Sequence, residues 1–226
     1  MLLRLKNEKG EFIPPYPCVM AFYDNGLTAE LDTVLVLCAL RQFACGAEPV
    51  VSINVSGRSL RNPDFIKTVL PQIEALNLSQ QRRIIFEIHE SGLSEAMSPR
   101  VLELCRKLGV GFAIDDVGLS MNDIFRLSEF ENIADFVKLD RQSVHTHPQG
   151  KYSLDHVMQL ISATLPNAYV IAEGIQNADH AATVMLFHPG IHYVQGMHLP
   201  ERGIFAKEWD SLKSRSEKTP EEAIIK

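Results

Sequence analysis

Residues 110–116 read VGFAIDD, an apolar run that ends on a pair of aspartates. We predict a strand over Val110–Ile114, and five further apolar runs lie along the chain: Pro49–Asn54, Arg83–Ile88, Asp135–Leu139, Ala168–Ala172 and Ile191–Val194. Apolar runs without alternating polar residues are typical of strands in a parallel sheet that is covered on both faces. The sequence therefore predicts such a sheet.

Segments with helical spacing separate these runs. We expect helices over residues 28–45, 62–76, 94–107, 121–130, 152–165, 178–187 and 205–215. Asn62-Pro63 and Ser98-Pro99 are typical helix starts, and Lys107-Leu108-Gly109 is a typical helix end. Alternating strands and helices leave two architectures, a doubly wound open sheet and a (β/α)₈ barrel. The chain has neither a GxGxxG nor a P-loop pattern, which favours the barrel.

The strand count bears on how complete this barrel is. Leu2–Leu5 and the six runs give seven strands, whereas a barrel of this type closes with eight. Either one strand escapes the sequence patterns, or the first strand lies upstream of this chain. We expect a barrel domain over residues 1–213 and a polar tail over 214–226.

The composition is that of an ordinary globular protein. Of the 226 residues, 46% are hydrophobic and 22% charged, and the net charge is −6. The hydrophobic fraction argues against general disorder. The negative net charge argues against extensive electrostatic binding to a nucleic acid duplex or an anionic membrane. No run reaches the roughly 18 apolar residues of a membrane helix. The four cysteines lack CxxC spacing and resemble small core residues, so we expect a cytoplasmic protein.

Polar side chains recur in the predicted strands or just after them. They are Asn54, Glu87, Glu90, Asp115, Asp116, Lys138, Glu173 and Gln195. Each alone is explained by a helix cap or a turn. Their recurrence on successive strands is better explained by a common site, because the carboxyl ends of parallel barrel strands meet at one rim. Glu87 and Lys138 are the most informative, since a buried charge is costly unless it is paired or binds a metal.

Oxygen donors without clustered cysteines suit hard cations such as Mg²⁺ or Mn²⁺. Adjacent carboxylates such as Asp115 and Asp116 can hold one or two ions, and two ions can clamp a phosphate diester for attack by water. A lysine beside them can orient that water. His89 lies near the rim, whereas the other histidines show no metal spacing and are interpreted as surface or packing residues.

Several ordered motifs resemble the EAL domain family, the barrel phosphodiesterases that linearise the bacterial second messenger cyclic di-GMP. They are LLR at 2–4, SINVS at 52–56, FEIHES at 86–91, IDDVG at 114–118, VKLDRQSV at 137–144, VIAEG at 170–174 and VQG at 194–196. The resemblance spans nearly the whole chain, from Leu2 to about Trp209.

The resemblance implies a role for each matching residue. The metal ligands would be Asn54, Glu87, Asp115, Asp116 and Glu173. Lys138 would orient the attacking water, and Glu90 would steady the loop after the paired aspartates. Arg4 would contact the cyclic dinucleotide, and Gln195 would lie at the rim of the site.

The chain also departs from the family pattern. The family's opening glutamate would fall just before Met1, which agrees with the missing eighth strand. Ser120 replaces a loop glycine, Gln176 stands where a second glutamate is usual, and the closing motif reads QGMHLPER. Tyr23 replaces an acid that usually precedes the Gly-Leu pair at 26–27.

These departures favour a domain that binds cyclic di-GMP as a signalling receptor or regulator, with weak or no hydrolysis. The alternative is an active metal-dependent phosphodiesterase that produces linear pGpG. A regulatory protein partner, an upstream sensory domain and a homodimer remain open.

Overall fold

The computed structural model describes residues 5–44, 50–89, 99–118, 127–130, 133–145, 154–196 and 199. The chain divides into two compact units. One comprises Met1–Ile88 and Glu95–Gly111, and the other comprises His89–Ser94 and Phe112–Lys226. Each unit is described by itself.

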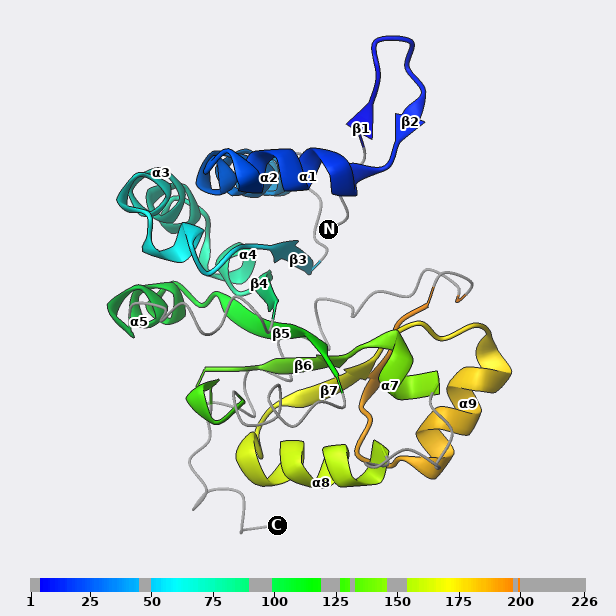
Figure 1. Cartoon of the computed structure of the whole chain (residues 1–226). Coiled ribbons are helices and arrows are strands. Elements are labelled where there is room, and N and C mark those ends of the chain that lie inside the picture. Colours follow the sequence, from blue (N-terminus) through cyan, green and yellow to red (C-terminus); the bar gives the residue numbers. More distant parts are fainter. Residues whose placement is uncertain are drawn as a thin grey trace. The chain divides into compact units, whose positions relative to one another are not determined.

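The first unit begins with a hairpin and two helices. Strands β1 (Leu5–Lys6) and β2 (Phe12–Ile13) pair in antiparallel fashion, and α1 (Pro15–Asp24) and α2 (Thr28–Ala44) follow. Figure 1 shows α1 and α2 side by side. The next elements are β3 (Val51–Asn54), a 3₁₀ turn η1 (Ser59–Arg61), α3 (Pro63–Glu74), α4 (Leu78–Gln81), β4 (Ile84–His89) and α5 (Pro99–Lys107).

The hairpin corrects one sequence prediction. Leu5 was expected to end a barrel strand, but it pairs with Ile13 across the turn that follows β1. The Asn7 side chain accepts hydrogen bonds from the backbone N–H groups of Lys9 and Glu11, and Gly10 has a φ of 81°. An Asn turn that ends in a left-handed glycine folds the chain back on itself. The rest of that predicted strand, residues 2–4, lies outside the described residues.

Strands β3 and β4 pair in parallel, with Asn54 opposite Glu87. The helix between them starts as the sequence predicts. The Asn62 side chain accepts hydrogen bonds from the backbone N–H groups of Asp64 and Phe65, and Pro63 occupies the first turn. Helix α3 then buries one apolar face, formed by Phe65, Val69, Leu70 and Ile73. Capping and burial together explain why a helix forms here.

A buried carboxylate holds the segment that follows β3. Asp32 of α2 accepts hydrogen bonds from the backbone N–H of Ser56, at 2.8 Å, and from the hydroxyl of Ser59, at 2.6 Å. Burial raises the pKa of Asp32, although these two hydrogen bonds oppose the shift. Asp32 therefore fixes the chain two residues beyond Asn54, which is a predicted site residue.

The second unit contains a parallel sheet in the order β5-β6-β7-β8. Its elements are β5 (Gly111–Val117, which starts at the last residue of the first unit), η3 (Ser128–Phe130), β6 (Phe136–Leu139), α7 (Arg141–His145), α8 (Leu154–Thr164), β7 (Tyr169–Ala172), α9 (Ala178–Phe187) and β8 (Tyr193–Val194). Helix α8 runs along β7 (Figure 1) and buries Leu154, Val157 and Ile161. The 3.6-residue period of a helix places these three side chains on one face.

Six predicted strands are confirmed as β3 to β8, and helix 178–187 is confirmed with the same bounds. Most of the predicted helix 121–130, all of helix 205–215 and the predicted tail 214–226 lie outside the described residues. Helix α1 is not among the predicted helices, and its segment carries prolines at 14, 15 and 17. Pro15, however, is tolerated at the start of a helix, where its missing N–H costs nothing.

The cysteine interpretation holds only in part. Cys105 is buried, and burial raises the pKa of its thiol to about 12. Cys38 is exposed on α2, which contradicts the expectation that it is a core residue.

Within the described part of the chain, none of the helices combines the length and apolar character that crossing a membrane requires.

Changing Asp32 tests how the segment after β3 is held. We expect Asp32→Ala to lower the free energy of unfolding by about 1–3 kcal/mol, because one buried and one part-buried donor lose their acceptor. Asp32→Asn should be nearly neutral at pH 7, because an amide oxygen can accept both bonds without a buried charge.

The pH dependence follows from the raised pKa of Asp32. The folded protein holds this proton more tightly than the unfolded chain, so the wild-type contribution to stability falls as pH rises from 3.8 through the raised pKa. Asp32→Asn lacks this fall. Urea unfolding from pH 3.5 to 7 measures the difference, and equal damage by both substitutions at pH 7 would contradict the assignment.

Candidate metal centre

A local irregularity in β5 brings two neighbouring carboxylates to one place. Successive side chains of a regular strand point to opposite faces, which would separate Asp115 from Asp116. The β5–β6 register shifts between Ile114 and Val117, and Asp116 has a φ of 57°, in the left-handed region. One carboxylate oxygen from each of Asp115, Asp116 and Glu173 consequently lies within 4.8 Å of the others. These three residues are called the acidic cluster below.

A lysine lies against the acidic cluster. Lys138 is the third residue of β6, whose four residues are all buried, and it is only 5% exposed. Its Nζ atom lies 2.8 Å from an oxygen of Asp115 and 2.7 Å from an oxygen of Glu173. Two ion pairs therefore compensate the buried ammonium group, which would otherwise be costly.

The environment affects the carboxylates differently. Burial raises the pKa of Glu173, and the opposing effect of Lys138 does not cancel it. The pKa of Asp116 is lowered, first by a hydrogen bond from His89, whose Nε2 atom lies 3.2 Å from the carboxylate. The cluster thus contains one carboxylate that resists ionisation and one that favours it.

The turn after β7 fixes Glu173. Its backbone N–H donates to the carbonyl of Leu139 at 3.1 Å. Gly174 has a φ of 71°, and a Cβ atom there would lie 2.4 Å from Cγ of Arg141. Both the left-handed conformation and the limited space therefore favour glycine after Glu173.

Two other predicted ligands belong to the first unit. Asn54 and Glu87 lie opposite each other at the ends of β3 and β4. The hydroxyl of Ser52 donates to Glu87 at 2.5 Å. The structure therefore brings the predicted ligands together in two groups, this pair and the acidic cluster.

Of the three remaining predicted site residues, the structure describes Gln195 but not Arg4 or Glu90. Gln195 directly follows β8, and its backbone N–H donates to the carbonyl of Ala172 while its side chain is exposed. Arg4 and Glu90 lie outside the described residues. The roles assigned to these three residues stay predictions.

Sequence reasoning missed the contacts of two histidines. His89 lies against Asp116, although it was noted only as lying near the rim. The ring of His145 donates from Nε2 to the carbonyl of Gly174 at 2.9 Å, so it supports the turn after Glu173 and is not merely a surface residue. Histidine spacing could not reveal either contact, because the partners come from other strands and turns.

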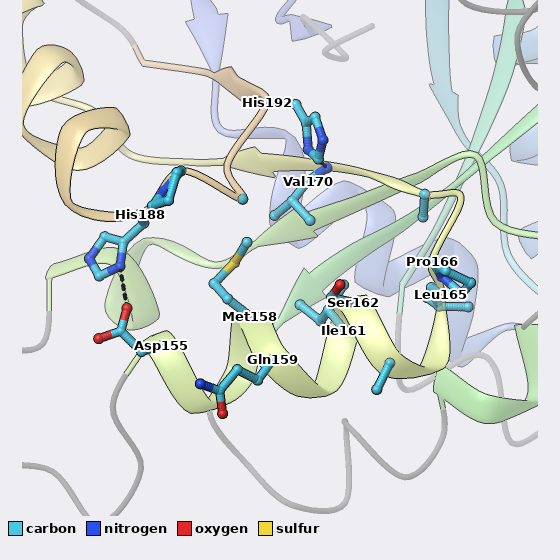
Figure 2. Close-up of a pocket in the computed structure, with 14 residues that line it drawn as sticks. Asp155, Met158, Gln159, Ile161, Ser162, Leu165, Pro166, Val170, His188 and His192 are labelled. Carbon is cyan, nitrogen blue, oxygen red and sulfur yellow. Dashed lines mark hydrogen bonds and ion pairs between the residues drawn. The ribbon is translucent and has the colours of Figure 1, made fainter. Parts of the chain in front are cut away.

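A hollow of about 760 Å³ lies elsewhere in the second unit. Figure 2 shows it between α8, Val170 of β7 and the segment before β8, with His188 paired to Asp155 at 2.8 Å. None of the acidic cluster lines it. We therefore do not interpret it as the metal site.

The donor set fits a divalent cation. Three carboxylates offer oxygen atoms close to one another, and hard cations such as Mg²⁺, Mn²⁺ and Ca²⁺ prefer such ligands. Lys138 neutralises part of the negative charge of the cluster.

Comparison with known proteins identifies the family. The model of the EAL domain family matches residues 1–201, and the chain belongs to this family. A comparison with curated proteins gives no match.

Solved EAL domain structures share the fold. The FimX EAL domain of Xanthomonas citri, in complex with c-diGMP, has 20% identity and a TM-score of 0.71, over 85% of this chain and 77% of that one. The phosphodiesterase PaMucR in a c-di-GMP complex has 22% identity and a TM-score of 0.64, over 87% of both chains.

A third similar structure is the S helix-GGDEF-EAL part of Vibrio cholerae LapD bound to c-di-GMP. It has 20% identity and a TM-score of 0.71, over 86% of this chain. This chain covers 47% of that one, about half of its length. Together these similarities confirm the predicted (β/α)₈ fold class.

Removing the lysine tests the electrostatic balance of the acidic cluster. We expect Lys138→Met to lower the free energy of unfolding by about 3–5 kcal/mol in the presence of a chelator, because two largely buried carboxylates lose their counter-charge. Adding Glu173→Gln should restore part of the loss, since one negative charge is then removed. Urea unfolding of both single variants and the double variant measures this coupling, and strictly additive effects would contradict it.

Proposed function

We propose that this chain binds cyclic di-GMP as a signalling receptor or regulator, with weak or no hydrolysis. The observation that carries the proposal is the acidic cluster against the buried Lys138, in a member of the EAL domain family. The similar solved structures of FimX, LapD and PaMucR each contain c-di-GMP. They support this ligand for the present chain.

The dinucleotide carries two negatively charged phosphates, whereas this protein has a net charge of −6. An acidic cluster repels a phosphate, and a bound cation would offset this repulsion. We assign Asp115, Asp116 and Glu173 to hold Mg²⁺ or Mn²⁺, as one or two ions. On the family resemblance, Asn54 and Glu87 are further ligands of this centre. When bound, such ions polarise the phosphate and activate water.

The protein's own residues would then position the phosphate and the water. Lys138 is held by Asp115 and Glu173 at 2.8 and 2.7 Å, so its ammonium group is fixed in direction. A fixed donor can orient a water molecule or offset charge on a phosphate oxygen without further reorganisation. Arg4 is assigned to contact a phosphate, and Gln195 to the rim of the site.

We infer weak hydrolysis from residues near the site that differ from those usual in the family. Gln176 replaces a glutamate that is usual in the family, and it is exposed in the segment between β7 and α9, three residues after Glu173. An amide cannot take up a proton or bring negative charge to a metal as a carboxylate does. Ser120 and the closing QGMHLPER motif change further parts of the pattern. Small errors in ligand position reduce rate far more than they reduce binding.

The second candidate is an active phosphodiesterase that produces pGpG. It is favoured by Lys138, whose two ion pairs suit the orientation of an attacking water. The similarity to the phosphodiesterase PaMucR also favours it.

Calorimetric titration with cyclic di-GMP, with and without Mn²⁺, tests binding, and chromatography of the same samples tests for pGpG. We expect Mn²⁺-dependent binding that Asp115→Asn abolishes, with little or no pGpG. Asp155→Asn is the matched control, because it changes an exposed aspartate away from the acidic cluster. Rapid pGpG production that Glu87→Ala removes would contradict the receptor and favour the enzyme.

Arg4 provides a separate prediction about the ligand. Arg4→Ala should weaken cyclic di-GMP binding about tenfold, because a charge-assisted contact to phosphate is lost. The same titration measures it, with Arg61→Ala on η1 as the control. Unchanged affinity would show that Arg4 does not contact the dinucleotide.

A further inference from the structure

A histidine contacts Asp116, one residue of the acidic cluster. β4 ends at His89, and the Nε2 atom of this residue lies 3.2 Å from Oδ2 of Asp116. The two side chains are 53% and 50% exposed, so both can be reached from solvent. The two-residue period of a strand places His89 on the same face of β4 as Glu87, a predicted metal ligand.

The 3.2 Å separation suits two arrangements. It is the length of a hydrogen bond from the ring to the carboxylate. It is also close to the separation of neighbouring ligands around an octahedral ion, which is roughly 3 Å when each ligand is about 2.1 Å from the metal. An ion held by Asp116 would therefore have an imidazole nitrogen within reach after only a small adjustment.

A nitrogen donor changes which ions the centre prefers. Mg²⁺ and Ca²⁺ prefer carboxylate, carbonyl and water oxygens, Mn²⁺ accepts both oxygen and nitrogen ligands, and imidazole suits Fe²⁺, Ni²⁺ and Zn²⁺. Affinity for nitrogen-containing sites also rises along the first transition series, so Mn²⁺ and Co²⁺ gain more from an imidazole than Mg²⁺ does.

We propose that His89 is a nitrogen ligand of the divalent ion held by Asp116, and that it makes this centre selective for transition metals over Mg²⁺. This inference rests on the metal centre assigned under the proposed function. Its competitor is a positioning role, in which His89 only donates a hydrogen bond that orients Asp116. The two roles differ in whether nitrogen contacts the metal.

Electron spin echo envelope modulation of the Mn²⁺-loaded full chain reads this contact directly, because a coordinated imidazole nitrogen modulates the Mn²⁺ signal. We expect ¹⁴N modulation in the wild type, its loss in His89→Gln, and its retention in His188→Gln. The last variant is a matched control, since His188 also lies 2.8 Å from a carboxylate but is away from the cluster. Glutamine at position 89 keeps an N–H donor for Asp116 and removes the imidazole.

Calorimetric titration of the chelator-treated chain with Mn²⁺, and separately with Mg²⁺, measures the selectivity. We expect His89→Gln to weaken Mn²⁺ binding 10- to 100-fold and Mg²⁺ binding less than threefold. Mn²⁺ binding without ¹⁴N modulation in the wild type, or equal losses for both ions in His89→Gln, would overturn the role of His89 alone. Failure of the wild type to bind Mn²⁺ at all would overturn the metal centre itself, and this inference with it.

Discussion

The pairing of one buried ammonium group with two carboxylates is the constraint around which the second unit is organised. Lys138 lies in the fully buried strand β6, where a charge without partners would be strongly unfavourable. Asp115 provides one partner from the neighbouring strand β5, and Glu173 provides the other directly after the neighbouring strand β7. The strand order β5-β6-β7 thus places Lys138 between its two carboxylate partners, and a sheet with another strand order would separate Lys138 from them.

The same interaction explains why irregular backbone is tolerated nearby. The register shift in β5 and the left-handed Asp116 interrupt an otherwise regular ladder, and a left-handed non-glycine residue costs of order 1–3 kcal/mol. Gly174 adds a second left-handed position just after Glu173. Both irregularities lie next to carboxylates of the acidic cluster. The backbone is therefore bent where charged oxygens have to converge, and it stays regular in the apolar parts of the strands.

Most of the fold could be predicted because burial on both faces leaves a simple pattern in the sequence. The six parallel strands are continuous apolar runs, and Asn62-Pro63 marks the start of α3 through a cap that depends only on neighbouring residues. The hairpin of Leu5 was missed because its turn, from Asn7 to Gly10, was not weighed against an apolar start to the chain. In the site, the polar residues at strand ends were recognisable, but the contacts of His89 and His145 were not. Those contacts depend on the bend at Asp116 and the turn at Gly174, which hydrophobic periodicity does not encode.

The left-handed backbone at Asp116 also restricts how this position can change over evolutionary time. Aspartate, asparagine and glycine are the residues that adopt such a conformation most readily. In the genetic code, an aspartate codon becomes an asparagine or a glycine codon by a single transition. The substitutions that remove the carboxylate most easily are therefore also those that the backbone accepts best. A lineage carrying this fold can lose the Asp116 carboxylate with little structural penalty, so folded descendants with a smaller acidic cluster are readily accessible to natural selection.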